Sequence, residues 1–146
     1  MSKTLIVLLI VAFASAGIFG QAKRSKFDPD GSFWIHGDPP ADFSDVSAIN
    51  LNAKKLRRLP APGLELKSSK TLRFQVLNVT RESFTFRTVV LSNISYSFTG
   101  KFLKGGVYAA ANLDDETPVL EGTLTKYEHG QKVAEAQLKF VYFGGT

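Results

Sequence analysis

"GTLTKYEHGQKVAEAQLKF", residues 122–140, contains the most regular pattern in the chain and decides its fold class. On both sides of a short break, apolar or small residues alternate with polar ones. A period of two residues is typical of half-buried β-strands, because successive side chains point to opposite faces of a sheet. The break, residues 128–130, contains a glycine and predicts a hairpin turn.

The faces of the two strands predict the length of this turn. A two-residue turn at His129 and Gly130 would place Leu124 opposite Glu135, which sets an apolar side chain against a charged one. A turn that is one residue longer pairs Leu124 with Ala134 and keeps the apolar face continuous. We therefore expect a type I turn closed by a G1 bulge, with Gly130 at positive φ.

The same alternation is found upstream, so we expect a six-strand antiparallel meander over residues 71–143. Residues 104–107, KGGV, are typical of a two-residue glycine turn, which would place Gly100 opposite Ala111. The predicted core consists of Phe84, Phe86, Tyr96, Phe98, Phe102, Leu124, Leu138 and Phe140.

Residues 27–67 are less regular. Two short apolar segments, residues 33–35 and 46–51, are separated by turn-forming residues. Residues 52–60 predict either a short helix that begins at Asn52 or a loop. The meander must cover its apolar face, so the predicted fold is an all-β, up-and-down barrel of about eight strands that uses two N-terminal strands. A two-layer β-sandwich is the alternative.

The first residues are typical of a signal peptide. Lys3 supplies a positive charge, and the apolar run of residues 5–13 is too short for a membrane-spanning helix. We expect cleavage after Ala22, which divides the chain into a signal peptide, residues 1–22, and a single domain, residues 23–146. The expected location is secreted or periplasmic.

The composition excludes several kinds of chemistry. The chain of 146 residues contains no cysteine, so it has no disulfide, no thiol nucleophile and no thiolate metal ligand. Its hydrophobic fraction of 44% and twelve phenylalanines supply an apolar core instead. Asn78 and Asn93 begin N-x-S/T sequons, which are glycosylation acceptors only in a eukaryotic secretory pathway.

Candidate catalytic residues are few. His36 lies close to Asp38 and Asp42 in the sequence, which leaves a small secreted hydrolase or isomerase as an alternative function. No sequence pattern marks a nucleophile for His36, so we predict a protein that is not an enzyme. Residues 28–31, DPDG, are typical of a turn and lack the later oxygen ligands of a calcium loop. We expect neither a metal nor a cofactor.

The candidate binding residues are mainly basic, in a chain of net charge +5. A short run could attract an anionic ligand or surface, although such runs are commonly only solvated. Trp34 is expected to be buried at one end of the barrel, and is also a candidate for ligand contact. The candidate ligand-binding residues are Lys54, Lys55, Arg57, Arg58, Trp34 and His36.

These features predict an exported, non-catalytic β-barrel module that binds a small apolar or anionic ligand, or an envelope or protein partner. Nucleic acid is not an expected partner, because no stacking motif accompanies the basic run. An integral membrane protein is not expected either. An outer-membrane β-barrel is a further alternative, for which six long strands are fewer than the usual minimum of eight.

Mass spectrometry of the exported protein tests the signal peptide. The mature chain should begin at Lys23, or at Gly17 if the earlier small residues are used, because small residues precede both positions. Recovery of Met1 on the exported protein would contradict the prediction.

Overall fold

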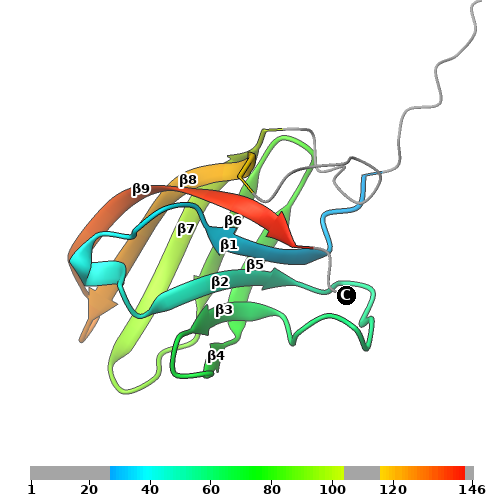
Figure 1. The fold of residues 1–146 in the computed structure, drawn as a ribbon. Helices are drawn as coiled ribbons and strands as arrows, with labels where there is room; N and C mark the ends of the chain where they lie inside the picture. Colours follow the sequence, from blue (N-terminus) through cyan, green and yellow to red (C-terminus); the bar gives the residue numbers. More distant parts are fainter. Residues whose placement is uncertain (1–26, 104–115, 144–146) are drawn as a thin grey trace, which may run out of the picture.

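In the part of the chain that the structure describes, nine antiparallel strands form one sheet that curls into a barrel (Figure 1). The computed structural model describes residues 27–103 and 116–143. The elements are β1 (Gly31–Ile35), η1 (Ala41–Phe43, a 3-10 helix), β2 (Val46–Leu51), β3 (Gly63–Leu66), β4 (Thr71–Leu72), β5 (Phe74–Val79), β6 (Phe84–Thr88), β7 (Ile94–Phe102), β8 (Pro118–Glu128) and β9 (Gln131–Phe143).

The order of the strands is that of an up-and-down barrel. It runs β4-β3-β2-β1-β9-β8-β7-β6-β5, so strands that are neighbours in the sheet are also neighbours in the chain, except for the closing pair of β1 and β9. The two ends of the order, β4 and β5, are joined directly through Arg73. The predicted all-β antiparallel barrel is therefore confirmed, and the sandwich alternative is not adopted.

The seam of the barrel lies where β4 passes into β5. On one side, Leu72 of β4 pairs with Leu64 of β3. On the other side, the carbonyl of Arg73 accepts a hydrogen bond from the backbone N–H of Val89 (2.9 Å), and β5 then pairs with β6. Pro62 precedes β3 and has no N–H, so β3 is not extended alongside β5. The edge of β5 that faces away from β6 has no neighbouring strand in the described part of the chain.

Side chains fill the interior of the barrel. All eight predicted core residues are buried, with at most 6% of each exposed. The N-terminal elements add Phe33 from β1 and Phe43 from η1, each at most 1% exposed. The rings of Phe84, Phe86 and Phe98 form a cluster in which the centroids of each pair lie 5.5–5.6 Å apart. The apolar face of the meander is thus the inner face.

Two glycines that face each other make room for the ring of Phe98 in this core. Gly100 of β7 faces Gly122 of β8. A Cβ atom added to Gly100 would lie 2.5 Å from Cζ of Phe98, and one added to Gly122 would lie 2.6 Å from the same atom. The Phe98 ring therefore occupies the space that side chains would take at both positions, and the two strands approach closely beneath it.

The N-terminal part of the domain is more regular than predicted. Residues 27–67 contain three strands and η1, instead of two strands in an irregular segment. Residues 52–60 form a loop and not a helix. The Asn52 side chain accepts a hydrogen bond from the N–H of Leu56 (2.7 Å) and donates to the carbonyls of Leu56 (3.0 Å) and Pro60 (3.2 Å). The Asn52 side chain thus bonds to the N–H and C=O groups of Leu56, which would bond to other backbone groups in a helix.

The predicted three-residue turn of the β8–β9 hairpin is wrong. Glu128 pairs with Gln131, so the turn contains only two residues. These are His129 and Gly130, with φ of 50° and 76°. Positive φ at both central positions is the requirement of a type I′ turn, whose twist matches that of the flanking strands. The prediction of positive φ at Gly130 is confirmed.

A β-bulge explains why the predicted faces are nevertheless correct. The register shifts next to Lys126, where Val133 is an extra residue on β9. This inserted residue restores the alternation, so Leu124 faces Ala136 and not Glu135. The predicted partner of Leu124, Ala134, is wrong by two residues along β9, which leaves the side chain on the same face.

The predicted pairing of Gly100 with Ala111 is also wrong. Gly100 pairs with Phe84 of β6 on one side and with Gly122 of β8 on the other. Both edges of β7 are occupied at this position, so no further strand can pair there. The predicted glycine turn at residues 104–107, like Ala111, lies outside the described residues.

Candidate functional site

Three surfaces on the outside of the barrel carry the candidate functional residues. Because aromatic side chains fill the interior, recognition by the described residues falls to these outer surfaces. We call them the aromatic patch (Trp34, Val141 and Phe143), the basic loop (residues 52–60) and the hydroxyl face (the outward Ser, Thr and Arg side chains of β6 and β7).

The aromatic patch lies on the outer face of β1 and β9. Trp34 pairs with Val141 across the two strands and is 47% exposed. Phe143 is 45% exposed, and its ring centroid lies 6.3 Å from that of Trp34 in an edge-to-face arrangement. Together with Ile35 and Tyr142, these side chains line a shallow hollow of about 420 Å³.

The prediction that Trp34 is buried at a barrel end is wrong. Phe33 takes the inward position on β1 and is fully buried. The next side chain along a strand must point outward, so Trp34 lies on the surface. Two large exposed rings side by side are unusual on a protein surface and mark this patch as a candidate contact site.

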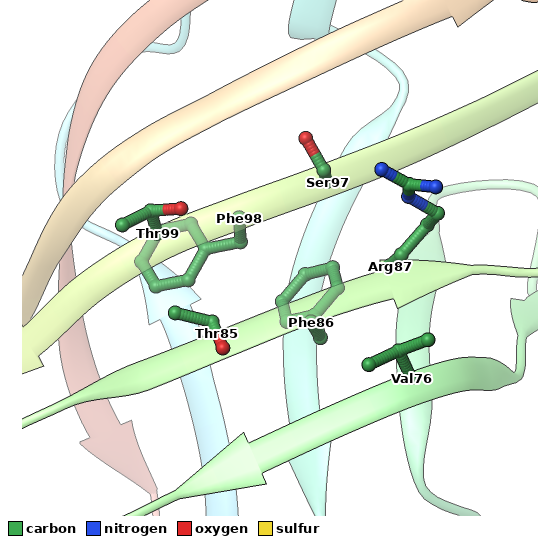
Figure 2. Close-up of a pocket in the computed structure, with 7 residues that line it drawn as sticks. All are labelled: Val76, Thr85, Phe86, Arg87, Ser97, Phe98 and Thr99. Atoms are coloured by element: carbon green, nitrogen blue, oxygen red, sulfur yellow. The ribbon is translucent and has the colours of Figure 1, made fainter.

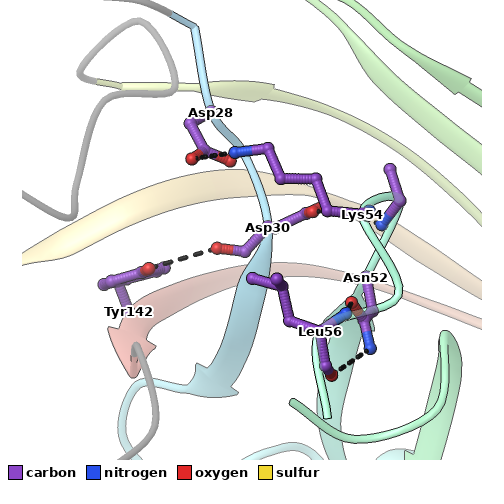
Figure 3. Close-up of polar contacts among 7 residues, drawn as sticks. Asp28, Asp30, Asn52, Lys54, Leu56 and Tyr142 are labelled. Carbon is purple, nitrogen blue, oxygen red and sulfur yellow. Dashed lines mark hydrogen bonds and ion pairs between the residues drawn. The ribbon is translucent and has the colours of Figure 1, made fainter. Parts of the chain in front are cut away.

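The basic loop is held to β1 by one carboxylate (Figure 3). Asp30, which is 6% exposed, accepts hydrogen bonds from the backbone N–H groups of Ala53 (2.8 Å) and Lys54 (2.9 Å). Its partners lie more than twenty residues away, so the local sequence contains no signal for this role. Residues 28–31 are thus an extended lead into β1 and not the predicted turn.

Most of the predicted basic residues are exposed on this loop. Lys54 forms an ion pair with Asp28. Lys55, Arg57 and Arg58 are exposed and form no ion pair with any residue that the structure describes. The loop therefore presents three positive charges that are not compensated locally.

Tyr142, which packs against the core opposite Phe33, bonds to the segment that holds the basic loop. Its hydroxyl donates a hydrogen bond to the carbonyl of Asp30 (3.1 Å), as Figure 3 shows. A Cβ on Gly31 would lie 2.3 Å from the Tyr142 ring, so the glycine lets this ring lie against β1. Burial, more than the charge of Asp28, raises the pKa of the Tyr142 hydroxyl, and the positive charge of Arg58 acts in the opposite direction.

The hydroxyl face forms a second hollow, of about 390 Å³. Thr85 and Arg87 of β6 and Ser97 and Thr99 of β7 line it, with Val76 of β5 at its border (Figure 2). Cross-strand pairing fixes this arrangement, because Thr85 faces Thr99 and Arg87 faces Ser97. Hydroxyl groups and a guanidinium suit polar recognition, but no acid or histidine lines this hollow.

The candidate catalytic residues do not converge. His36, Asp38 and Asp42 are all exposed in the segment between β1 and β2. The backbone N–H of His36 donates to the carbonyl of Lys139 (2.8 Å), which continues the ladder between β1 and β9. Residues 27–103 and 116–143 contain no group of three or more His, Asp or Glu side chains that could hold a metal ion.

One polar pair between a buried tyrosine and an exposed aspartate was not predicted. The Tyr96 hydroxyl, in the interior, donates to the carboxylate of Asp45 (3.1 Å). Burial first, and then the negative charge of Asp45, raises the pKa of Tyr96. The pair ties β7 to the end of the segment that carries η1.

Both sequon asparagines are exposed. Asn78 lies on β5, and Asn93 lies in the turn before β7. Ser92 and Asn93 have φ of 51° and 64°, which indicates a second type I′ turn. Their accessibility is compatible with modification, whose occurrence stays a prediction.

Comparison with known proteins adds no relative. No protein-family model matches the chain, and neither the curated proteins nor the solved structures provide a match. Among the described residues there is no helix long and apolar enough to cross a membrane.

Replacement of Asp30 tests the anchor of the basic loop. Asp30→Ala removes a charged acceptor from two backbone N–H groups, so the free energy of unfolding should fall by ~1.5–3 kcal/mol. Hydrogen exchange at the amides of Ala53 and Lys54 should accelerate. Asp38→Ala, at an exposed position, serves as the control and should change stability by less than ~0.5 kcal/mol. Unchanged exchange at both amides would show that Asp30 does not hold the loop.

Proposed function

We propose that this protein is an exported, non-catalytic binding module that recognises an amphipathic anion on the outside of its barrel. The ligand has an apolar group, which lies on the aromatic patch, and a negatively charged group, which lies against the basic loop. The observation that carries the proposal is the exposed pair of Trp34 and Phe143 beside the end of β1 where Gly31 pairs with Leu51, after which the loop with its exposed basic residues begins.

The aromatic patch favours an apolar ligand group. Burial of apolar surface stabilises a complex by about 25 cal/mol per Å², and aromatic side chains offer large areas for it. Trp34 and Phe143 are nearly half exposed, so much of their area is still available for contact. A ligand inside the barrel would instead have to displace the buried phenylalanine cluster.

The basic loop favours a negatively charged group. The Asp30 and Asn52 hydrogen bonds fix the loop backbone, so the charges of Lys55, Arg57 and Arg58 are displayed from an ordered segment. Arginine also binds phosphate and carboxylate groups in a bidentate manner. Gly31 pairs with Leu51 and Ser32 pairs with Phe143, so the loop that follows Leu51 and the ring of Phe143 lie at the same end of β1.

Export and the lack of catalysis are parts of the same proposal. Export rests on the apolar segment and small residues that precede Lys23. A non-catalytic role is supported by the exposed and separate positions of His36, Asp38 and Asp42, which offer no acid–base pair around a common point.

Fluorescence titration tests the proposal, because Trp34 is the only tryptophan in the chain. Dodecyl phosphate below its micelle concentration should shift the Trp34 emission to shorter wavelength, since the indole leaves water. Dodecanol, with the same chain and no charge, should bind at least tenfold more weakly. Vesicles of phosphatidylglycerol and phosphatidylcholine, compared with monomeric dodecyl phosphate, distinguish a membrane surface from a free ligand as the source of the anion.

Two double variants distinguish the effect of the basic loop from the effect of the protein's net charge. Arg57→Gln with Arg58→Gln should weaken the binding of dodecyl phosphate about tenfold or more, at ~1 kcal/mol for each charge near an anionic surface. Lys67→Gln with Lys70→Gln removes two exposed charges from the turn between β3 and β4 and should change binding less than twofold. The absence of any emission shift, or equal shifts with dodecanol, would refute the proposal.

A further inference from the structure

We infer that the free edge of β5 is a strand-addition site for an extended, acidic peptide segment. The site is separate from the aromatic patch and the basic loop, and it arises from the way in which the barrel closes. β5 is the last strand of the sheet order, and among the described residues it pairs only with β6. Its residues from Gln75 to Asn78 are all exposed.

The direction of the backbone groups on β5 follows from the turn at its end. The N–H of Thr80 donates to the carbonyl of Ser83 (2.8 Å), so the backbone of Thr80 is directed at the β6 side. Backbone direction alternates along an antiparallel strand. The N–H and C=O groups of Val79 and Leu77 therefore point away from β6, and no described residue bonds to them.

Two local features of the sequence shape this edge: a proline before β3 and a bulge in β5. Pro62 ends the pairing of β3, which would otherwise continue along this edge. A bulge between Phe74 and Val76 shifts the register against β6, so Val76 faces Arg87 on the outer surface while Leu77 faces Phe86 on the inner one. An unpaired strand edge is a template for another extended chain.

The side chains on the edge are suited to an added strand. Val76 is 50% exposed on the outer face, and Leu77 is 41% exposed although it points to the core side. An added strand would cover both, one with each of its alternating faces. Val76 also borders the hollow that Thr85 and Arg87 line, which offers space for an outward side chain of the incoming segment (Figure 2).

The charges favour an acidic peptide over a second copy of this chain. Arg73 at the start of β5 and Arg87 beside Val76 are exposed, and neither forms an ion pair with a described residue. In a symmetric antiparallel pair of β5 strands centred on Leu77, Arg73 of each copy would face Arg81 of the other. Like charges directly opposite one another destabilise a strand pair, whereas Asp or Glu side chains on a partner would stabilise it.

Backbone-modified peptides test the site on the unaltered protein. The probe is a fluorescein-labelled peptide of sequence Asp-Val-Thr-Val-Asp-Val-Glu, measured by fluorescence anisotropy on protein made in a host without N-glycosylation. N-methylation at alternate residues blocks one edge of the peptide. Methylation of one edge should weaken binding at least tenfold, and methylation of the other edge should leave it within twofold. A Lys-for-Asp/Glu version should bind at least tenfold more weakly.

Amide exchange and protein variants locate the contact. Bound peptide should slow hydrogen exchange at Leu77 and Val79 at least fivefold, with no change at Leu124 in the barrel wall. Val79→Pro removes an outward N–H that bonds to no residue in the described part of the chain, so it should abolish binding, while Val90→Ser, at an exposed position off the edge, should not.

Three results would overturn the inference. They are equal binding of peptides methylated on either edge, equal binding of acidic and basic peptides, and unprotected amides at Leu77 and Val79 in the presence of bound peptide. Protection of these amides that depends only on protein concentration would assign the edge to a second copy and also contradict it.

Discussion

The ring of Phe98 lies over two facing glycines of β7 and β8, and the curvature of the sheet depends on this contact. A Cβ at Gly100 or Gly122 would overlap the ring or the neighbouring backbone, so the strands could not approach as they do. The same ring contacts Phe84, with centroids 5.5 Å apart, and Phe140, with centroids 5.7 Å apart. The glycine pair thus lets one large side chain contact rings from β6 and β9 within the filled core, whose apolar burial stabilises a barrel that has no cysteine.

The alternation of residue types predicted the fold class and the core, because burial imposes a period of two on each strand. It did not predict the hairpin register. The bulge at Val133 inserts one residue and restores the faces, so two different registers satisfy the same pattern. Of the candidate site, the exposed basic run was visible in the sequence. The exposure of Trp34 could not be predicted, because either Phe33 or Trp34 could have pointed into the core. The role of Asp30 could not be predicted either, because its hydrogen-bond partners are distant in the chain.

Because the interior is filled, the candidate binding surfaces lie on the outside of the barrel, and their positions depend on how the sheet closes. At one end, Asp30 holds a loop of positive charges near the exposed rings of Trp34 and Phe143. At the seam, Pro62 precedes β3, and no strand of the described residues pairs with the edge of β5 that faces away from β6. Both surfaces occur where regular strand pairing is interrupted. The basic loop is the long connection between β2 and β3, and the edge of β5 begins where the chain passes from pairing with β3 to pairing with β6.

A double-mutant cycle between Phe98 and Gly100 tests the central claim most directly. Two of the three closest contacts of a Cβ at Gly100 would be ring atoms of Phe98. Gly100→Ala should therefore destabilise the native protein more than it destabilises the Phe98→Leu variant, which lacks those atoms. The expected coupling in the free energy of unfolding is ~1 kcal/mol or more, within the range found for contacting residues. Additivity of the two substitutions within ~0.3 kcal/mol would contradict the account, because it would mean that the ring does not occupy the space above the glycine pair.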